Sequence, residues 1–118
     1  MGTVVKLLIV GGLLILSNLF MTYAWYGHLK DLRQAPLWLV VLSSWGVAFF
    51  EYCFQVPANR LGHAWGMSTA ALKTLQELIT LGVFVAFMTF YLGEPLRWNH
   101  AVGFGLIALG AAFVFKPF

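Results

Sequence analysis

Charged and amide side chains stand inside long apolar runs of this chain, where an ionised group costs about 3 kcal/mol on insertion scales unless it is paired or reaches water. Three of them, followed by a threonine, recur within two helical turns, which puts them on one face of a helix: Lys73, Gln76, Glu77 and Thr80. Such a face is too polar for lipid tails. Carboxylates placed in this way can hold a proton or a cationic group, which is the chemistry that proton-coupled transport requires.

A second polar face lies in the preceding apolar run, where Ser44, Glu51 and Gln55 are separated by seven and then four residues. With helix ends near residues 56 and 70, helical rise places both glutamates roughly a third of the way into a core of about 30 Å, from the same side. We therefore expect the two carboxylates to approach each other. The predicted substrate- and proton-binding residues are Glu51, Glu77, Lys73, Gln55, Gln76 and Asn18.

A purely structural interpretation of these residues stays open. Lys73 and Glu77 are four residues apart and could neutralise each other on one helix. The two glutamines could bridge helices, and Glu51 could bond to Arg60 or to a neighbouring hydroxyl. In that case the carboxylates would hold the fold together and would take no part in moving a solute.

The remaining sequence indicates an all-α integral membrane protein. The chain has 118 residues, of which 61% are hydrophobic and 9% are charged, which is too little charge for a soluble domain. Four apolar segments have the length of membrane-spanning helices, and we expect them to form one four-helix transmembrane bundle as a single domain over residues 1–118: residues 4–26, 37–56, 70–92 and 99–115.

The connections are short, so each helix should run antiparallel to the one before it and both termini should lie on one side. Three prolines, Pro36, Pro57 and Pro95, are expected at or beyond segment ends. Basic residues near the helix ends are almost balanced between the two sides, with Lys6, Arg60, Lys73 and Lys116 against Lys30, Arg33 and Arg97. A balance of this kind is typical of a protein that inserts in both orientations.

Several functional classes find no support in the sequence. No nucleophile stands with a base, and no glycine-rich phosphate loop follows a strand, so we expect no enzyme. The three histidines, His28, His63 and His100, fall at loops or helix ends, which predicts neither a metal site nor a haem or other cofactor. The net charge of +3 arises from residues flanking the helices and indicates no nucleic-acid partner.

The last apolar segment contains Gly103 and Gly110, which are seven residues apart and share one face. Small residues let a second helix come close enough for dispersion contacts, so this face predicts association with a second copy of the chain. Packing against the chain's own helices is the alternative.

The stretch "YLGEPLRWNHAVGFGLIALGAAFVF" resembles the end of a repeat unit in the drug/metabolite transporter superfamily, with a glutamate-bearing turn followed by a helix of the pattern G-x-x-L-I-x-x-G. "FEYCFQVPANR" and "LKTLQELITLGVFVAF" are similar to a four-helix branch of that superfamily with no assigned function. The resemblance covers most of the chain. Through the more distantly related small multidrug resistance proteins, it implies an antiparallel homodimer held largely by the last helix.

The small multidrug resistance proteins carry a glutamate in the first helix, five residues after a glycine. Here Ser17 stands at that spacing after Gly12, with Asn18 next, so Glu51 or Glu77 would have to exchange protons instead. The leading hypothesis is a homodimeric transporter in a bacterial inner membrane that moves a small, cationic solute through the lipid bilayer in exchange for protons. The alternative is a non-transporting membrane scaffold that associates through its last helix.

Overall fold

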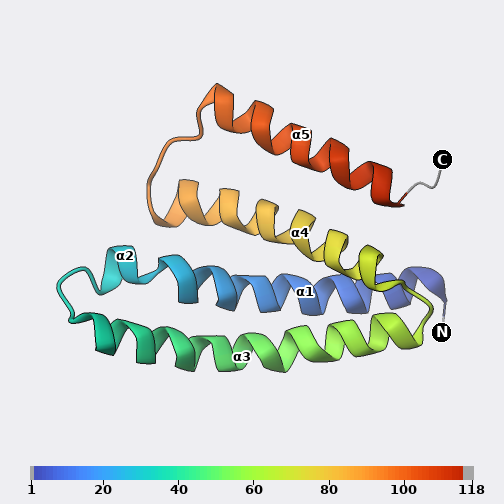
Figure 1. Ribbon diagram of the computed structural model, residues 1–118, viewed down its shortest axis with the longest axis horizontal. Helices are drawn as coiled ribbons and strands as arrows, with labels where there is room; N and C mark the ends of the chain where they lie inside the picture. Colours follow the sequence, from blue (N-terminus) through green and yellow to red (C-terminus); the bar gives the residue numbers. More distant parts are fainter. Residues whose placement is uncertain (1, 116–118) are drawn as a thin grey trace.

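Four long helices lie side by side in one flat layer, in the spatial order α3, α1, α4, α5 (Figure 1). The computed structural model describes residues 2–115 and measures 48 × 35 × 19 Å. The helices are α1 (Thr3–Tyr26), the one-turn α2 (His28–Asp31), α3 (Leu37–Ala64), α4 (Thr69–Ala86) and α5 (Trp98–Phe115). Within residues 2–115 there is no strand, and four helical spans are long and apolar enough to cross a membrane. The predicted all-α, four-helix membrane fold is confirmed.

Consecutive long helices run antiparallel, so the first residues of α1 and the last residues of α5 lie at the same end of the layer (Figure 1). We call this the terminal end. The connection between α3 and α4 also lies there, together with Lys6, whose ammonium sits 5.8 Å from the ring centroid of Trp65. Lys116, which we counted with the basic residues of this end, is outside the described residues.

The order of the helices differs from the expected one, because α1 lies between α3 and α4. Helix α3 packs mainly on α1 and has few contacts with α4, although these two helices follow each other in the chain. The second and third helices are therefore neighbours through only a few contacts, such as that of Gly62 with Leu72, and not along their length. Helix α1 is the one that both of them contact extensively.

The second long helix continues beyond its predicted end. Helix α3 passes through Pro57 and ends at Ala64, eight residues after Val56. Proline removes one backbone donor, but membrane helices tolerate it where neighbouring groups make up for the loss. The expectation that Pro57 closes the helix is wrong, and Glu51 consequently lies near the middle of α3 rather than a third of the way along it.

The two sharp turns next to α4 depend on glycine. Gly66 has φ +98° and lies in the four-residue connection that precedes α4, where Ser68 Oγ accepts a hydrogen bond of 3.0 Å from the amide of Ala71. At its other end, α4 widens into a π-helical turn, η1 (Phe87–Tyr91), and Gly93 then takes φ +74°. A π turn is often a functional feature, and here it sets the position of Tyr91.

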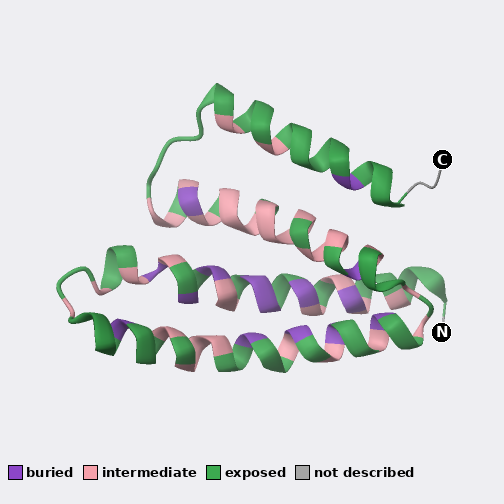
Figure 2. Cartoon of the chain, viewed as in Figure 1, coloured by how far each residue is buried: buried purple, intermediate pink, exposed green. Residues whose placement is uncertain are grey.

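Buried residues are concentrated on α1 and on the face of α3 that meets it (Figure 2). Toward the terminal end, Val10 and Leu14 of α1 form an apolar cluster with Ala58 of α3 and Leu72 of α4. Farther along the same helices the buried side chains are polar: Ser17, Asn18, Thr22, Glu51 and Gln55. The middle of the layer is therefore a polar region held between apolar contacts.

Candidate functional site

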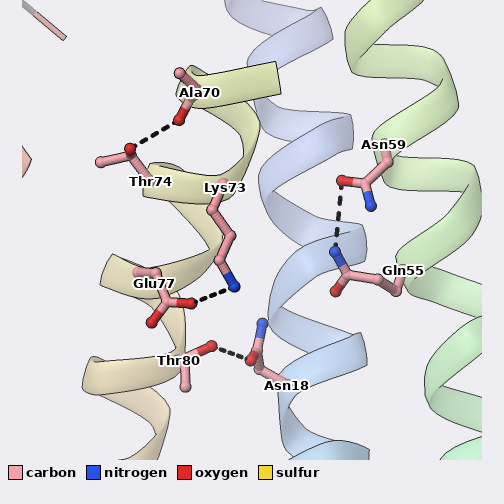
Figure 3. A network of polar contacts seen from close by, with 8 residues as sticks. All are labelled: Asn18, Gln55, Asn59, Ala70, Lys73, Thr74, Glu77 and Thr80. Carbon is pink, nitrogen blue, oxygen red and sulfur yellow. Dashed lines mark hydrogen bonds and ion pairs between the residues drawn. The ribbon is translucent and has the colours of Figure 1, made fainter. Parts of the chain in front are cut away.

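A cavity of about 500 Å³ opens between α3 and α4, with α1 behind it. Figure 3 shows Lys73 of α4 reaching Glu77 and Gln55 of α3 reaching Asn59, on either side of α1. All six residues predicted to bind substrate or protons line this one cavity: Asn18, Glu51, Gln55, Lys73, Gln76 and Glu77. The structure thus brings the two polar faces of α3 and α4 together with Asn18 of α1, and α1 is the element that unites them.

Glu51 is the most deeply placed carboxylate of the cavity, with only 2% of its surface exposed. Its Oε1 accepts a hydrogen bond of 2.9 Å from Ser17 Oγ of α1. Its other oxygen, Oε2, is buried and has no hydrogen-bond partner among the described residues. A buried acceptor without a partner is costly for an ionised carboxylate, so the site favours a protonated Glu51 or a donor group brought by a solute.

The structure corrects the expected partner of Glu51, which is on α1 and not on α4. We expected the carboxylate of Glu51 to approach that of Glu77 on α4, with the second segment ending at residue 56. Its hydrogen bond goes instead to Ser17 of α1, and the chain turns only after Ala64. Glu77 lines the same cavity, but no hydrogen bond joins the two carboxylates among the described contacts.

Ser17 connects Glu51 to a chain of hydrogen bonds on α3. Its Oγ lies 2.9 Å from Glu51 Oε1 and 2.8 Å from Gln55 Oε1, yet a hydroxyl has one proton to donate. Both contacts are satisfied when a protonated Glu51 donates to Ser17 and Ser17 donates to Gln55. When Glu51 is ionised, both are satisfied only if the Gln55 amide turns over and donates to Ser17.

The proton on Glu51 is therefore linked to the orientation of Gln55. The Gln55 amide also donates to Asn59 Oδ1 over 3.4 Å, one turn closer to the terminal end. If the Gln55 amide turned over, Asn59 would face the amide oxygen of Gln55, an acceptor, in place of its amide nitrogen, a donor. The arrangement can transmit a change of protonation at Glu51 toward the mouth of the cavity without any movement of the backbone.

Asn18 anchors α4 to α1. Its amide nitrogen donates to the backbone oxygen of Leu14 over 2.7 Å, and its Oδ1 accepts a short hydrogen bond from Thr80 of α4. Asn18 is 2% exposed, so its polar groups are used within the protein. Figure 3 shows this contact beside the Lys73–Glu77 pair. Asn18 can therefore contact a solute only through the small part of its side chain that lines the cavity.

Lys73 and Glu77 form the ion pair that the structural interpretation foresees, with Nζ and Oε1 2.8 Å apart. Their side chains nevertheless stay 67% and 52% exposed, on the open side of the cavity. Glu77 is eight residues into α4, about 12 Å along its axis, which is well inside a bilayer. An ion pair at this depth must face water or another protein surface, because lipid tails would not solvate it.

The sequence analysis allowed a neighbouring hydroxyl as a partner of Glu51 but did not identify it as Ser17. It also missed a polar clamp at the end of the layer opposite the termini. There, Asp31 accepts a hydrogen bond of 2.6 Å from Tyr23 and a short one from Tyr91 of η1. Lys30 donates to the backbone oxygen of Tyr91 over 2.9 Å and lies 4.3 Å from the centroid of its ring.

The clamp ties the end of α4 to α1 and α2. The adjoining end of the cavity is lined by Tyr26 and Phe84, whose rings meet edge to face with centroids 5.3 Å apart. This end is therefore held by aromatic packing and by the Asp31 clamp together. The terminal end has no comparable aromatic pair among the described residues that line the cavity.

Asp31→Asn is expected to loosen this end, because a neutral amide is a weaker acceptor for two phenol groups than a carboxylate. Amide hydrogens of Phe87–Tyr91 should exchange several-fold faster in the variant, measured by mass spectrometry on protein in lipid nanodiscs. Glu94→Gln removes a carboxylate near the same end, outside the clamp, and should leave the exchange unchanged. Equal exchange in the wild-type protein and Asp31→Asn would show that the clamp does not hold η1.

The predicted association face on α5 makes no close contact with the other described helices. A Cβ added at Gly103 or Gly110 would meet no atom within 4 Å, apart from the backbone of its own helix. Helix α5 packs on α4 through another face, on which Ala111 is its one buried residue within the described range. Of the two explanations for these glycines, packing against the chain's own helices finds no support in the described contacts.

Within residues 2–115 no group of three His, Cys, Asp or Glu side chains is arranged to hold a metal ion.

A family model described as "Putative member of DMT superfamily (DUF486)" matches residues 10–115, where DMT denotes the drug/metabolite transporters. No match was found among curated proteins or among solved structures.

Proposed function

We propose that this chain, which belongs to the DUF486 family of the drug/metabolite transporter superfamily, moves a small, positively charged solute across a membrane in exchange for protons. The solute would pass without chemical change. The observation that carries the proposal is the buried carboxylate of Glu51, one oxygen of which is unpartnered among the described residues beside a polar cavity. A carboxylate in this position can hold either a proton or a cationic group, and competition between the two would couple their movements.

The protein would work as a homodimer. In a single chain the Lys73–Glu77 pair is more than half exposed at membrane depth, where lipid would make it unfavourable. A second copy laid over the open face of the layer would cover this pair and close the cavity between the subunits. The unused glycine face of α5 supports the same assembly, because it permits close contact between helices.

An inverted arrangement of the two copies suits the balanced charges of the helix ends. Two identical chains in opposite orientations, in the manner of the small multidrug resistance proteins, give a site that has the same structure when seen from either side. Opening toward one side then requires the same contacts as closing toward the other, which is the basis of alternating access. In one chain the terminal end of the cavity would be open while the clamp at Asp31 holds the other end.

The scaffold alternative requires both glutamates to be dry and every carboxylate oxygen to be paired within the chain. Glu51 Oε2 has no partner among the described residues, and the Glu77 side chain is 52% exposed. These two observations favour the transporter. We place it in the inner membrane of a bacterium, which is the setting implied by the resemblance to small multidrug resistance proteins.

The proposal is tested with the purified protein in lipid vesicles that contain a trapped pH-sensitive dye. A panel of guanidinium, alkylammonium and amino-alcohol cations is added outside, and proton movement is followed. At least one cation should drive protons outward at a rate well above that of protein-free vesicles. A panel in which every cation leaves the internal pH at the protein-free rate would contradict proton exchange and favour the scaffold.

A further inference from the structure

We infer that the protein has a second binding subsite, for the anionic group of an elongated solute whose positively charged end reaches Glu51. The inference rests on the proposed function, because it defines the substrate class of the same pathway. It concerns a separate cavity of about 580 Å³ at the terminal end, which we call the outer cavity. The cavity that contains Glu51 is the inner cavity.

The outer cavity is built by the last turns of α3 and the first turns of α4. Asn59, Arg60 and His63 line it from α3, and Thr69 and Lys73 line it from α4. Three residues also line the inner cavity, so the two spaces adjoin: Asn59, Lys73 and Gln76. A solute could therefore extend from one cavity into the other without leaving the protein.

The outer cavity carries positive charge that no described residue neutralises. The chain has four acidic residues, and only Glu77 is near this end, where it is already paired with Lys73. Arg60 makes no ion pair among the described residues, and its guanidinium offers a planar set of donors that matches phosphate and carboxylate. Thr69 is the first residue of α4, so the positive end of that helix dipole adds to the same potential.

The inner cavity, in contrast, requires a proton or a positively charged group. Glu51 Oε2 is buried without a partner among the described residues, so it accepts a proton or a cationic donor. Glu51 and Arg60 are nine residues apart on α3, which corresponds to about 13 Å along the helix axis. One solute that satisfies both subsites must be elongated, with a phosphate or carboxylate at one end and an ammonium or guanidinium group at the other.

Two sources of such chemistry exist, a soluble amphoteric solute and a lipid whose headgroup carries both a phosphate and an amine. Both would place a phosphate near Arg60, but only two carbons separate phosphate from amine in phosphatidylethanolamine, so a lipid would occupy the outer cavity without reaching Glu51. They differ in whether bilayer lipids compete with a soluble molecule for the outer cavity. An experiment that varies lipid composition separates them while testing the anion subsite itself.

The test uses the full chain in phosphatidylcholine nanodiscs and a series of ω-aminoalkyl phosphates of increasing chain length, with inorganic phosphate and the matching alkylamines as single-group probes. Binding is followed by calorimetry. Affinity for aminoalkyl phosphates should rise with chain length to an optimum and exceed that for either single-group probe. Arg60→Gln should weaken aminoalkyl phosphate and phosphate binding about tenfold, as expected for the loss of a charge-assisted contact, and leave alkylamine binding unchanged.

Arg97→Gln is the matched control, because it removes one arginine from the connection at the other end and should change none of these affinities. Arg60→Lys keeps the charge and should restore part of the phosphate binding. Equal phosphate binding in the wild-type protein and Arg60→Gln, with alkylamine binding retained, would overturn the anion subsite and leave the proposed function standing. If the wild-type protein shows no alkylamine binding that depends on Glu51, the proposed function is contradicted instead.

The lipid arm repeats the titration in nanodiscs in which phosphatidylethanolamine replaces half of the phosphatidylcholine. A severalfold loss of aminoalkyl phosphate affinity that disappears in Arg60→Gln identifies a lipid headgroup as the occupant. Unchanged affinity with the Arg60 dependence preserved identifies a soluble amphoteric solute. Either result supports the anion subsite, whereas competition that is independent of Arg60 would place the lipid elsewhere and contradict it.

Discussion

Glu51→Gln is expected to reduce solute-driven proton movement in vesicles to the rate of protein-free vesicles. Glutamine keeps the size of the side chain and can still bond to Ser17, but it cannot release or take up a proton. Because Glu51 is the one buried carboxylate among the described residues of the cavity, no other described acid in the site can replace it at this depth. The measurement is the initial rate of dye response after addition of the cation that gives the largest response with the wild-type protein.

Glu77→Gln separates the two carboxylates. This substitution leaves Lys73 unpaired in the cavity, which disfavours a cationic solute, and should lower the rate only partly. Combining it with Lys73→Gln removes the unpaired charge and should recover part of the loss. Glu94→Gln, outside the cavity, should retain the full rate. Full activity of Glu51→Gln would remove this residue from the coupling mechanism.

Replacing both Gly103 and Gly110 with Leu is expected to convert the proposed homodimer into monomers. The two glycines occupy one open face of α5, and leucine side chains would keep a second helix from approaching it. Overpacking a close contact costs roughly 1–3 kcal/mol, so each leucine should weaken association about tenfold or more. Subunit counting by single-molecule photobleaching in lipid measures the dimer fraction over a range of protein-to-lipid ratios.

Gly105→Leu is the matched control for this prediction. Gly105 is also exposed in α5, and a Cβ added there would likewise meet no atom within 4 Å, but it lies on a different face from Gly103 and Gly110. Its replacement adds the same apolar volume to the same helix and should leave the dimer fraction unchanged. If Gly105→Leu and the Gly103/Gly110 double variant behave alike, association does not use the predicted face.

The polar cavity could be predicted from the sequence because its members are conspicuous. Lys73, Gln76 and Glu77 repeat at helical spacing in an apolar run, and a face of that kind has to turn away from lipid. Helical rise then brings Glu51 and Gln55 to a comparable depth. All of these residues line one cavity, even though the depth of Glu51 and the end of its helix were misjudged.

The neighbour relations could not be predicted in the same way. Consecutive helices with short connections usually pack along their length, yet α3 and α4 have few contacts, because α1 packs against both of them. The choice of Ser17 as the partner of Glu51 follows from this packing. The clamp at Asp31 depends on the π turn of η1, which moves Tyr91 to a position that regular α-helical spacing does not indicate.

Exchange of protons between Glu51 and water through the cavity is the central claim. Infrared difference spectroscopy on the protein in lipid, recorded across the pH range in which the fold is intact, measures this directly. We predict a carboxyl signal that changes reversibly with bulk pH, shifts in D₂O and is missing from Glu51→Gln. A Glu51 carboxyl that keeps one protonation state throughout, with no exchange in D₂O, would contradict the claim and leave this residue as a structural group.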